Sequence, residues 1–284
     1  MIFWIASYPK NGNTWLRSLL SAYYFTKDGN FINDTILKNI PQFPEKKYFD
    51  NFSYDKSIPI STTKFWIKAQ ELINTEKKIK FFKTHNVYGS LNDNEFSNKL
   101  NSIGAVYIIR DPRNVITSIM NHFEMDKEDA LKFILNEKKF TYDYFKKKDY
   151  SDFQFISSWE KNYKSWINNN DFPIKLIRYE DLINQTFYTV KDLINFIDKT
   201  CKLKANFNKL KAQNAIKTTS FEKLKKIEEN DGFVESMKSK KKDNNKVPFF
   251  HLGPNNNWKL FFDTKFTNKL NVIFKESLQE LQYH

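Results

Sequence analysis

The sequence predicts an α/β fold, a single domain whose central parallel sheet is flanked by helices. The chain has 284 residues, which fits one large domain, and no linker divides it, so we expect one domain over residues 1–284. Four short apolar runs are separated by polar turns and by segments with helical periodicity, as in a sheet that helices cover on both faces. These runs are Ile2–Ala6, 79–82, 105–109 and 174–177.

Helix signals follow the first and third apolar runs. After the first run, apolar side chains recur at helical spacing and are expected to face the sheet. Asp111 and Pro112 follow the third run and suit the N-cap and the first helical position. A stripe of aromatic side chains, spaced at i, i+4 and i+7, precedes the fourth run and is expected to lie in the core. The first helix carries Trp15, Leu16, Leu19, Leu20, Tyr23 and Tyr24, and the stripe is Trp159, Tyr163 and Trp166.

Two segments without clean periodicity, residues 41–66 and 230–250, are predicted to be long loops. The first is rich in aromatic residues, proline and charge, and the second contains the run KSKKKDNNK. Long loops in compact domains are usually functional or disordered, so both segments are candidates for functional loops.

The chain is strongly basic, with a formal net charge of +13 that comes almost entirely from lysine. A basic excess favours anionic partners, but a general surface bias towards lysine explains the charge equally well. The single cysteine, Cys201, permits no internal disulfide, and the histidines lie far apart without metal-ligand spacing. There is no leader segment and no apolar stretch of about 18 residues. We therefore expect a cytoplasmic protein with no metal and no transmembrane segment.

The turn SYPKNGNTW (residues 7–15) between the first apolar run and the first helix predicts an anion-binding loop. Gly12 permits close approach of a ligand to the backbone, and the amides of the first helical turn would point at an anion. Lys10 adds a mobile positive charge. An ordinary strand-to-helix turn is the alternative. The loop departs from G-x-x-x-x-G-K-[ST], because its lysine precedes its glycine and no hydroxyl follows that lysine to ligate Mg²⁺.

Polar residues also follow the second and third runs, at the sheet edge where α/β proteins bind ligands. Arg110 ends the third run and Ser118 lies about two helical turns later, so the two could grip one phosphate. Equally, Arg110 could pair with a nearby carboxylate. Lys83 and His85 follow the second run, and histidine suits a general base near neutral pH, although a structural role is commoner.

Together these motifs resemble the sulfotransferases that use 3′-phosphoadenosine 5′-phosphosulfate (PAPS). The family's YPKSGTTW stands here as YPKNGNTW, its KTH is residues 83–85, and its arginine-to-serine spacing is that of Arg110 and Ser118. The resemblance runs in order from Tyr8 to about Trp258 and implies a fold like that of P-loop nucleoside triphosphatases, with a phosphosulfate-binding loop. Three further family segments are SSWEKNYKSW (157–166), RYEDL (178–182) and TTSFEKL (218–224).

The resemblance implies three catalytic residues. His85 would be the base, Lys83 would contact the sulfuryl group, and Lys10 would neutralise charge on the bridging oxygen of the leaving phosphate. In-line sulfuryl transfer needs geometry and charge stabilisation more than covalent help, and no metal is implied.

The resemblance also implies residues that hold the cosubstrate PAPS. Arg110 and Ser118 would bind the 3′-phosphate, and Trp15 would stack on the adenine. The full implied set is Lys10, Asn11, Gly12, Asn13, Thr14, Trp15, Arg110, Ser118, Tyr179, Thr219, Phe221, His251 and Gly253.

One family segment is altered near the C-terminus. The family has RKG-x-x-G-x-W, whereas this chain has FHLGPNNNW, in which His251 and Leu252 replace the arginine and lysine. A cation at the 3′-phosphate is therefore missing, so either His251, the lysines 240–242 or Lys246 substitute for it, or binding is weaker. We expect these lysines to lie on a loop that closes over the nucleotide, with a solvated lysine run as the alternative.

No motif identifies the acceptor. Residues 41–66 and the stretch after His122 take the family's acceptor-side positions and are aromatic-rich, which suits a sugar, a lipid or a phenol. The basic, prokaryotic character of the chain favours a carbohydrate or lipid-linked glycan. No nucleic acid is expected as a partner. Two other functions compete. A P-loop-type nucleotide kinase would need metal, and a non-catalytic binder of acidic polymers would leave His85 and the ordered motifs unexplained.

Overall fold

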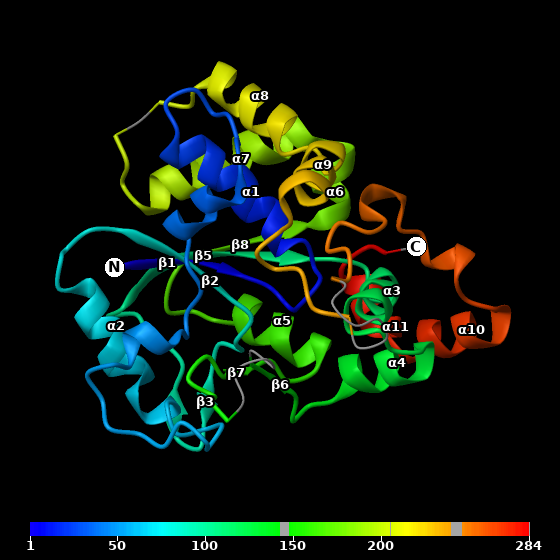
Figure 1. The fold of residues 1–284 in the computed structure, drawn as a ribbon, viewed down its shortest axis with the longest axis horizontal. Coiled ribbons are helices and arrows are strands. Elements are labelled where there is room, and N and C mark those ends of the chain that lie inside the picture. Colours follow the sequence, from blue (N-terminus) through cyan, green and yellow to red (C-terminus); the bar gives the residue numbers. More distant parts are fainter. Residues whose placement is uncertain (143–147, 205, 240–245, 284) are drawn as a thin grey trace.

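Four strands form a parallel sheet in the order β2-β1-β5-β8, which confirms the predicted α/β fold (Figure 1). The strands are β1 (Ile2–Ala6), β2 (Lys80–Thr84), β5 (Ser102–Ile109) and β8 (Ile174–Arg178). Trp4 in β1 pairs with Phe82 and Ala105, so the carboxyl ends of three strands lie at one edge of the sheet. The computed structural model describes residues 1–142, 148–204, 206–239 and 246–283.

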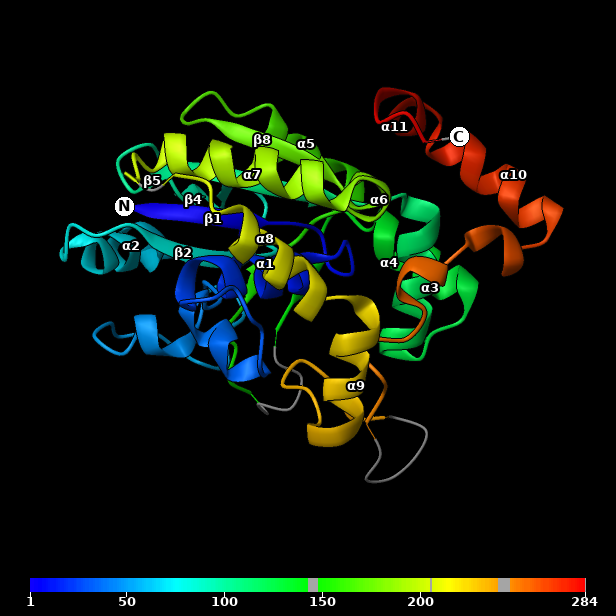
Figure 2. The same ribbon diagram turned by 90° about the horizontal axis from the view of Figure 1, so that it is seen from above.

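Helices connect the strands and cover both faces of the sheet (Figures 1 and 2). Within the described ranges, no helix is long and apolar enough to cross a lipid bilayer. The α-helices are α1 (Asn13–Phe25), α2 (Trp66–Asn74), α3 (Pro112–Phe123), α4 (Lys127–Leu135), α5 (Trp159–Ile167), α6 (Tyr179–Asn184), α7 (Thr186–Thr200), α8 (Lys209–Thr218), α9 (Phe221–Asp231), α10 (Thr264–Ile273) and α11 (Lys275–Glu280).

Shorter elements complete the chain outside the main sheet. Two antiparallel strand pairs are β3 (Ser90–Leu91) with β4 (Asn94–Glu95), and β6 (Phe140–Thr141) with β7 (Gln154–Phe155). Short 3₁₀ helices are formed by Asp34–Asn39, Lys46–Tyr48, Thr63–Phe65, Gly253–Asn255 and Trp258–Leu260.

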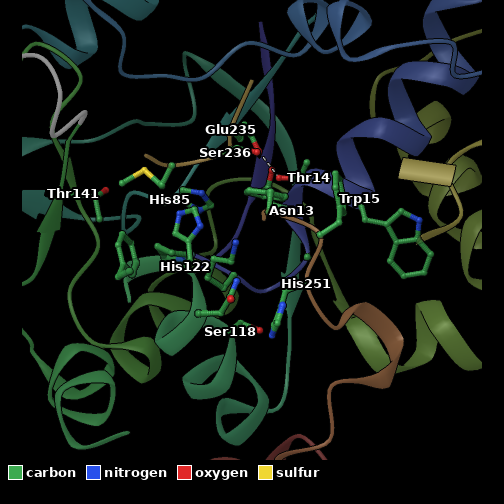
Figure 3. Close-up of a pocket in the computed structure, with 18 of the residues that line it drawn as sticks. Asn13, Thr14, Trp15, His85, Ser118, His122, Thr141, Glu235, Ser236 and His251 are labelled. Atoms are coloured by element: carbon green, nitrogen blue, oxygen red, sulfur yellow. Dashed lines mark hydrogen bonds between the residues drawn. The ribbon is translucent and has the colours of Figure 1, made fainter. Parts of the chain in front are cut away.

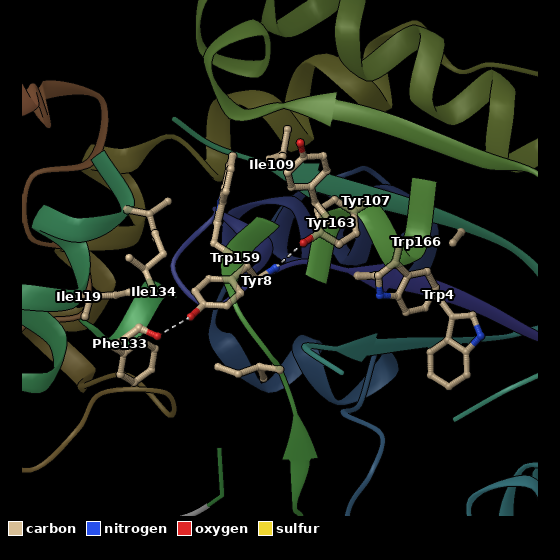
Figure 4. Close-up of a cluster of buried hydrophobic side chains, with 14 of the residues drawn as sticks. Trp4, Tyr8, Tyr107, Ile109, Ile119, Phe133, Ile134, Trp159, Tyr163 and Trp166 are labelled. Atoms are coloured by element: carbon tan, nitrogen blue, oxygen red, sulfur yellow. Dashed lines mark hydrogen bonds between the residues drawn. The ribbon is translucent and has the colours of Figure 1, made fainter. Parts of the chain in front are cut away.

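Side chains of β1 alternate between two cores, one on each face of the sheet. Phe3 belongs to a buried cluster with residues of α1, α7 and α8. Trp4 belongs to the opposite cluster, with residues of α2 and α5, and its ring lies 6.4 Å from that of Trp166 (Figure 4). The predicted core stripe on α5 is fully buried there, which confirms its assignment.

The segment 41–66, predicted as a functional loop, anchors aromatic side chains in the core, although much of its length is exposed. Phe43 and Phe49 are fully buried, and the Phe43 ring contacts Trp4. The Phe43 amide donates to the Lys83 carbonyl at 2.9 Å, so the segment covers the outer edge of β2. Gln42 is the one residue of 41–66 that lines the cavity described below. Its aromatic side chains therefore serve packing, and the predicted acceptor-side surface lies elsewhere.

Candidate active site

A cavity of about 780 Å³ opens at the carboxyl ends of the parallel strands, the edge at which open α/β sheets bind ligands. Its lining comes from the loop before α1, the residues after β2, helix α3, the strands β6 and β7, and the chain that follows α9. Figure 3 shows His85 and His122 turned towards this common space, with Thr14 on one side and Ser118 on another. The groups predicted from separate motifs thus meet in one cavity.

The loop between β1 and α1 presents an uncapped helix N-terminus to the cavity. Gly12 and Lys10 take left-handed conformations, at φ 101° and φ 68°, and no side chain caps the first turn of α1. A β-carbon at Gly12 would lie 2.5 Å from the Tyr179 ring, so only glycine fits there. Asn13 donates its side-chain amide to the Ile5 carbonyl at 3.0 Å, which holds the turn in place. The backbone amides of this turn can therefore receive an anion.

Lys10 is a partly buried cation beside this turn. Its Nζ lies 3.9 Å from the centre of the Phe249 ring, in a cation–π contact. Burial lowers the pKa of Lys10 to about 7; Lys83 and Arg110 lower it further, and Glu235 partly offsets them. Lys10 is thus partly deprotonated at neutral pH, and an arriving anion would favour its charged form.

His85 follows β2 and is held in one tautomer. Its Nδ1 lies 2.7 Å from the carbonyl oxygen of Ser7, which can only accept, so Nδ1 carries the proton. Nε2 then keeps its lone pair. Burial, aided by the charge of Lys83, lowers the pKa of His85 to about 3, so the ring is neutral at physiological pH. A neutral imidazole in this state can accept a proton from a hydroxyl.

Lys83 and Thr14 lie in the cavity but already bind an internal anion, the carboxylate of Glu235. The Lys83 Nζ donates at 2.8 Å, and the Thr14 hydroxyl donates at 2.5 Å. Arg17, which sequence analysis did not assign, donates to the same carboxylate at 2.5 Å. Burial would raise the pKa of Glu235, but Lys83 and Arg17 hold it well below its usual range.

Arg110 and Ser118 come together, as their spacing predicted. A terminal nitrogen of Arg110 lies 3.4 Å from the Ser118 hydroxyl. The alternative was a pair between Arg110 and an adjacent carboxylate. Asp111 does not form this pair, because it pairs with Arg113 at 2.8 Å. The Arg110 guanidinium is therefore aimed at Ser118, at the far end of the cavity from Glu235 in Figure 3.

Two other residues hold the Arg110 guanidinium in position, and a third reaches Ser118. Its central carbon lies 4.2 Å from the centre of the Tyr179 ring, and its other terminal nitrogen donates to the Gly253 carbonyl at 3.1 Å. Asn256 donates to the Ser118 hydroxyl at 3.1 Å and so adds a third polar side chain. The Arg110 Nε is buried and has no partner in the described part of the chain. An oxyanion here would receive planar, charge-assisted hydrogen bonds.

Aromatic side chains adjoin Arg110. Trp15 and Tyr179 meet edge to face, with ring centres 5.6 Å apart, and Phe221 also lines the cavity. Such flat apolar faces suit a nucleobase. Two of the implied residues do not reach the cavity, because the fully buried Thr219 donates its hydroxyl to its own helix, and the fully buried Asn11 donates to the Ile108 carbonyl.

Replacing Gly253 with alanine is expected to destabilise the protein by about 1–3 kcal/mol, the usual cost of overpacking. Gly253 has φ 53°, and a β-carbon there would lie 2.2 Å from the Phe221 ring. Urea unfolding monitored by circular dichroism measures the change. The matched control is Gly89→Ala, because a β-carbon at Gly89 meets no atom within 4 Å and should cost less than about 0.5 kcal/mol. Equal unfolding midpoints for the two variants would contradict the tight packing at Gly253.

The altered C-terminal segment places His251 and Lys246 on the cavity wall. Burial, with the charge of Lys225, lowers the pKa of His251, so its ring is largely neutral at physiological pH. The charged form of His251 is therefore disfavoured in the unliganded protein, and a bound phosphate would favour it, so His251 stays a candidate for the missing cation. The lysines 240–242, predicted to close over the nucleotide, lie outside the described residues.

His122 is a second neutral histidine in the cavity that sequence analysis gave no role. Burial and the nearby charge of Lys10 lower the pKa of His122 to about 2. Its Nδ1 is buried and has no hydrogen-bond partner among the described residues. The sequence contains a signal for this position of His122. It lies four residues after Ser118 and therefore on the same face of α3. Figure 3 shows its ring beside that of His85.

Other site residues could not have been found from local patterns. Gln154 accepts the His85 backbone amide at 2.8 Å, and Asn256 reaches Ser118 from a distant segment. Glu235 lies 221 residues from its partner Thr14 along the chain. None of these residues has a spacing that links it to its partner, so only the folded chain brings them to the site.

Comparison with known proteins gives one consistent result for the sequence. A family model described as Sulfotransferase domain matches residues 2–282. Sulfotransferase 1B1 of Mus musculus is 23% identical over 280 residues, covering 96% of this chain and 81% of that protein. Flavonol 3-sulfotransferase of Flaveria bidentis is 26% identical over 284 residues, covering 96% of this chain and 80% of that protein. Luciferin sulfotransferase of Photinus pyralis is 25% identical over 246 residues, covering 83% and 60%.

Solved structures share the fold. Mouse sulfotransferase SULT7A1 complexed with PAP superposes with a TM-score of 0.57 at 17% identity, covering 98% of this chain and 84% of that one. Retinol dehydratase in complex with androsterone and inactive cofactor PAP gives a TM-score of 0.55 at 17% identity, covering 98% and 80%.

Proposed function

The chain belongs to the sulfotransferase domain family, and on that premise we propose that it transfers a sulfuryl group from PAPS to a hydroxyl acceptor. The observation that carries this proposal is that two separate sets of groups suited to anions line one cavity. One is the turn from Lys10 to Trp15, and the other is Arg110 with Ser118. Aromatic side chains lie between them, so the cavity suits an aromatic nucleoside that carries two anionic groups.

Each anion site would hold one end of the cosubstrate. The helix amides and Lys10 would bind the 5′-phosphosulfate, and Arg110 and Ser118 would bind the 3′-phosphate. Asn256 would hold Ser118 in position, because its amide donates to the Ser118 hydroxyl and to the Asn114 carbonyl. Trp15 and Phe221 would contact the adenine.

The transfer itself needs few protein groups. The acceptor oxygen forms a bond to sulfur while the bond from sulfur to the bridging phosphate oxygen breaks, and adenosine 3′,5′-bisphosphate leaves. His85 would take the acceptor proton on Nε2, and its Nδ1–H remains bound to the Ser7 carbonyl. Lys10 would neutralise the charge that grows on the leaving phosphate. Lys83 would contact the sulfuryl oxygens once it leaves Glu235.

The acceptor side of the cavity combines hydrogen-bonding and aromatic side chains, which supports a carbohydrate or a lipid-linked glycan as acceptor. Sugar rings carry hydroxyls around their edge and have apolar C–H faces. Polar side chains can bind the hydroxyls, and aromatic side chains can pack against the C–H faces. The residues on this side are His122, Phe123, Lys139, Phe140, Thr141, Tyr142, Asp152 and Gln154.

A transfer assay tests this proposed function. The protein is incubated with [³⁵S]PAPS and either a series of simple sugars and glycolipids or a series of phenols. Label is expected to move to a hydroxyl acceptor, with sugars preferred over phenols. Phosphate transfer from ATP that depends on Mg²⁺, without sulfuryl transfer, would favour the nucleotide kinase instead.

The affinity for adenosine 3′,5′-bisphosphate is expected to fall by more than about tenfold from about pH 7 to about pH 9. Unliganded Lys10 has a pKa of about 7, and a bound phosphate would raise it, so binding takes up a proton that becomes scarce as pH rises. Calorimetry at several pH values measures this slope. Lys10→Met should bind more weakly at about pH 7 and should lose the slope. A slope that persists in the variant would assign it to another group that faces Lys10, such as Lys83.

A further inference from the structure

The Glu235 carboxylate occupies the position in the cavity where the chain gathers its hydrogen-bond donors. It comes from the segment after α9, yet it bonds to side chains of α1 and β2 (Figure 3). Its Oε1 accepts from both Arg17 and Lys83, and its Oε2 accepts from Thr14. A carboxylate with two cations and one hydroxyl around it has the environment of a bound phosphate or sulfate oxygen pair.

Arg17 belongs to this donor set by position. It lies three residues after Thr14 on α1, so the two side chains share one face of the helix. Its side chain is only 7% exposed, and its second terminal nitrogen donates to the Leu37 carbonyl at 3.3 Å. Without an anion, Arg17 and Lys83 would be two like charges buried side by side, which is costly. An anion therefore stabilises the charged forms of both side chains there.

We propose that Arg17 is a further anion-binding residue of the cosubstrate site, and that Glu235 is an internal anion which the 5′-phosphosulfate end of PAPS displaces. This inference rests on the proposed function. On displacement, Thr14, Arg17 and Lys83 exchange a carboxylate for a phosphosulfate, so their charges stay compensated. Lys83 is then free to contact the sulfuryl group.

The residues around Glu235 have anchors of their own. The Val234 amide donates to Asp34 at 3.0 Å, and the Ser236 hydroxyl donates to Glu228 at 2.6 Å. Glu228 also accepts the backbone amide of Phe250 at 2.9 Å. The neighbours of Glu235 are thus anchored by other carboxylates, so their anchoring does not depend on the Glu235 side chain.

Glu235→Gln tests the proposal, because it keeps the shape and removes the charge. The variant is expected to bind adenosine 3′,5′-bisphosphate about tenfold tighter than the wild type, since the ligand no longer displaces a competing anion. Adding Arg17→Gln to Glu235→Gln should weaken binding about tenfold again. The matched control is Glu229→Gln, which makes the same charge change at an exposed position of α9 and should leave the affinity unchanged. Calorimetry gives the affinities.

Inorganic sulfate, tested against sodium chloride at equal ionic strength, separates this proposal from the proposed function. Sulfate should raise the melting temperature of Glu235→Gln saturably, and should do so less for the wild type and for the double variant. If sulfate stabilises Glu235→Gln in this way but no variant binds the nucleotide, the anion site is supported and the proposed function is contradicted. Affinities of Glu235→Gln equal to or below those of the wild type for both ligands would overturn the proposal. If Glu235→Gln fails to fold, Glu235→Asp replaces it; its shorter side chain cannot reach all three donors and should give an intermediate gain.

Discussion

Replacing His85 with alanine is expected to lower kcat for sulfuryl transfer by about 10²- to 10⁴-fold, the usual contribution of a general base. The His85 ring is neutral and its Nδ1 proton is committed to the Ser7 carbonyl, so Nε2 is positioned to accept the acceptor proton. Because the ring has no partner at the phosphate sites, the affinity for adenosine 3′,5′-bisphosphate should change by less than about threefold. Steady-state kinetics and calorimetry measure the two quantities.

The companion variant is His85→Asn. Its side-chain amide can still donate to the Ser7 carbonyl, but it offers no basic nitrogen, so kcat should fall as far as in the alanine variant. A His85→Ala enzyme that keeps more than about half of the wild-type kcat would show that the ring is structural. A large loss in His85→Ala alone would assign the effect to the hydrogen bond with Ser7.

Replacing Lys10 with methionine is expected to lower kcat by about 10²- to 10³-fold, the range seen when one group that stabilises transition-state charge is removed. Lys10 lies two residues before the N-cap of α1, the end at which the proposed mechanism places the leaving phosphate. Single-turnover rates at saturating PAPS isolate this effect from binding. The control is Lys99→Met, which removes an exposed lysine distant from the cavity. A Lys10→Met defect confined to KM would make Lys10 a binding residue only.

The fold was predictable because its signals are local. Buried parallel strands are apolar throughout, and the four runs correspond to β1, β2, β5 and β8 in the structure. The chemistry was also partly local, since the loop to α1, the residues after β2 and the Arg110–Ser118 pair each lie within one strand-to-helix unit. Parallel pairing then brings the ends of these units together at one edge of the sheet.

The rest of the site depends on contacts that no local spacing encodes. Glu235 and Asn256 reach the cavity from segments far along the chain. A matching motif, conversely, does not guarantee that a side chain reaches the cavity. Thr219 belongs to a family segment, yet its buried hydroxyl donates to the Ala215 carbonyl at the end of α8. The aromatic residues of 41–66 suggested a ligand surface, yet aromatic side chains serve a core equally well, as Phe43 does.

The most direct test of the central claim is a calorimetric comparison of adenosine 3′,5′-bisphosphate with AMP. Two anion sites in one cavity predict that the bisphosphate binds about 10- to 100-fold tighter, since Arg110 adds charge-assisted hydrogen bonds worth about 1.5–3 kcal/mol. Arg110→Gln should abolish most of that preference while leaving the affinity for AMP nearly unchanged. Equal affinity of the wild-type protein for the two nucleotides would contradict the account, because the site of Arg110 and Ser118 would then bind no phosphate.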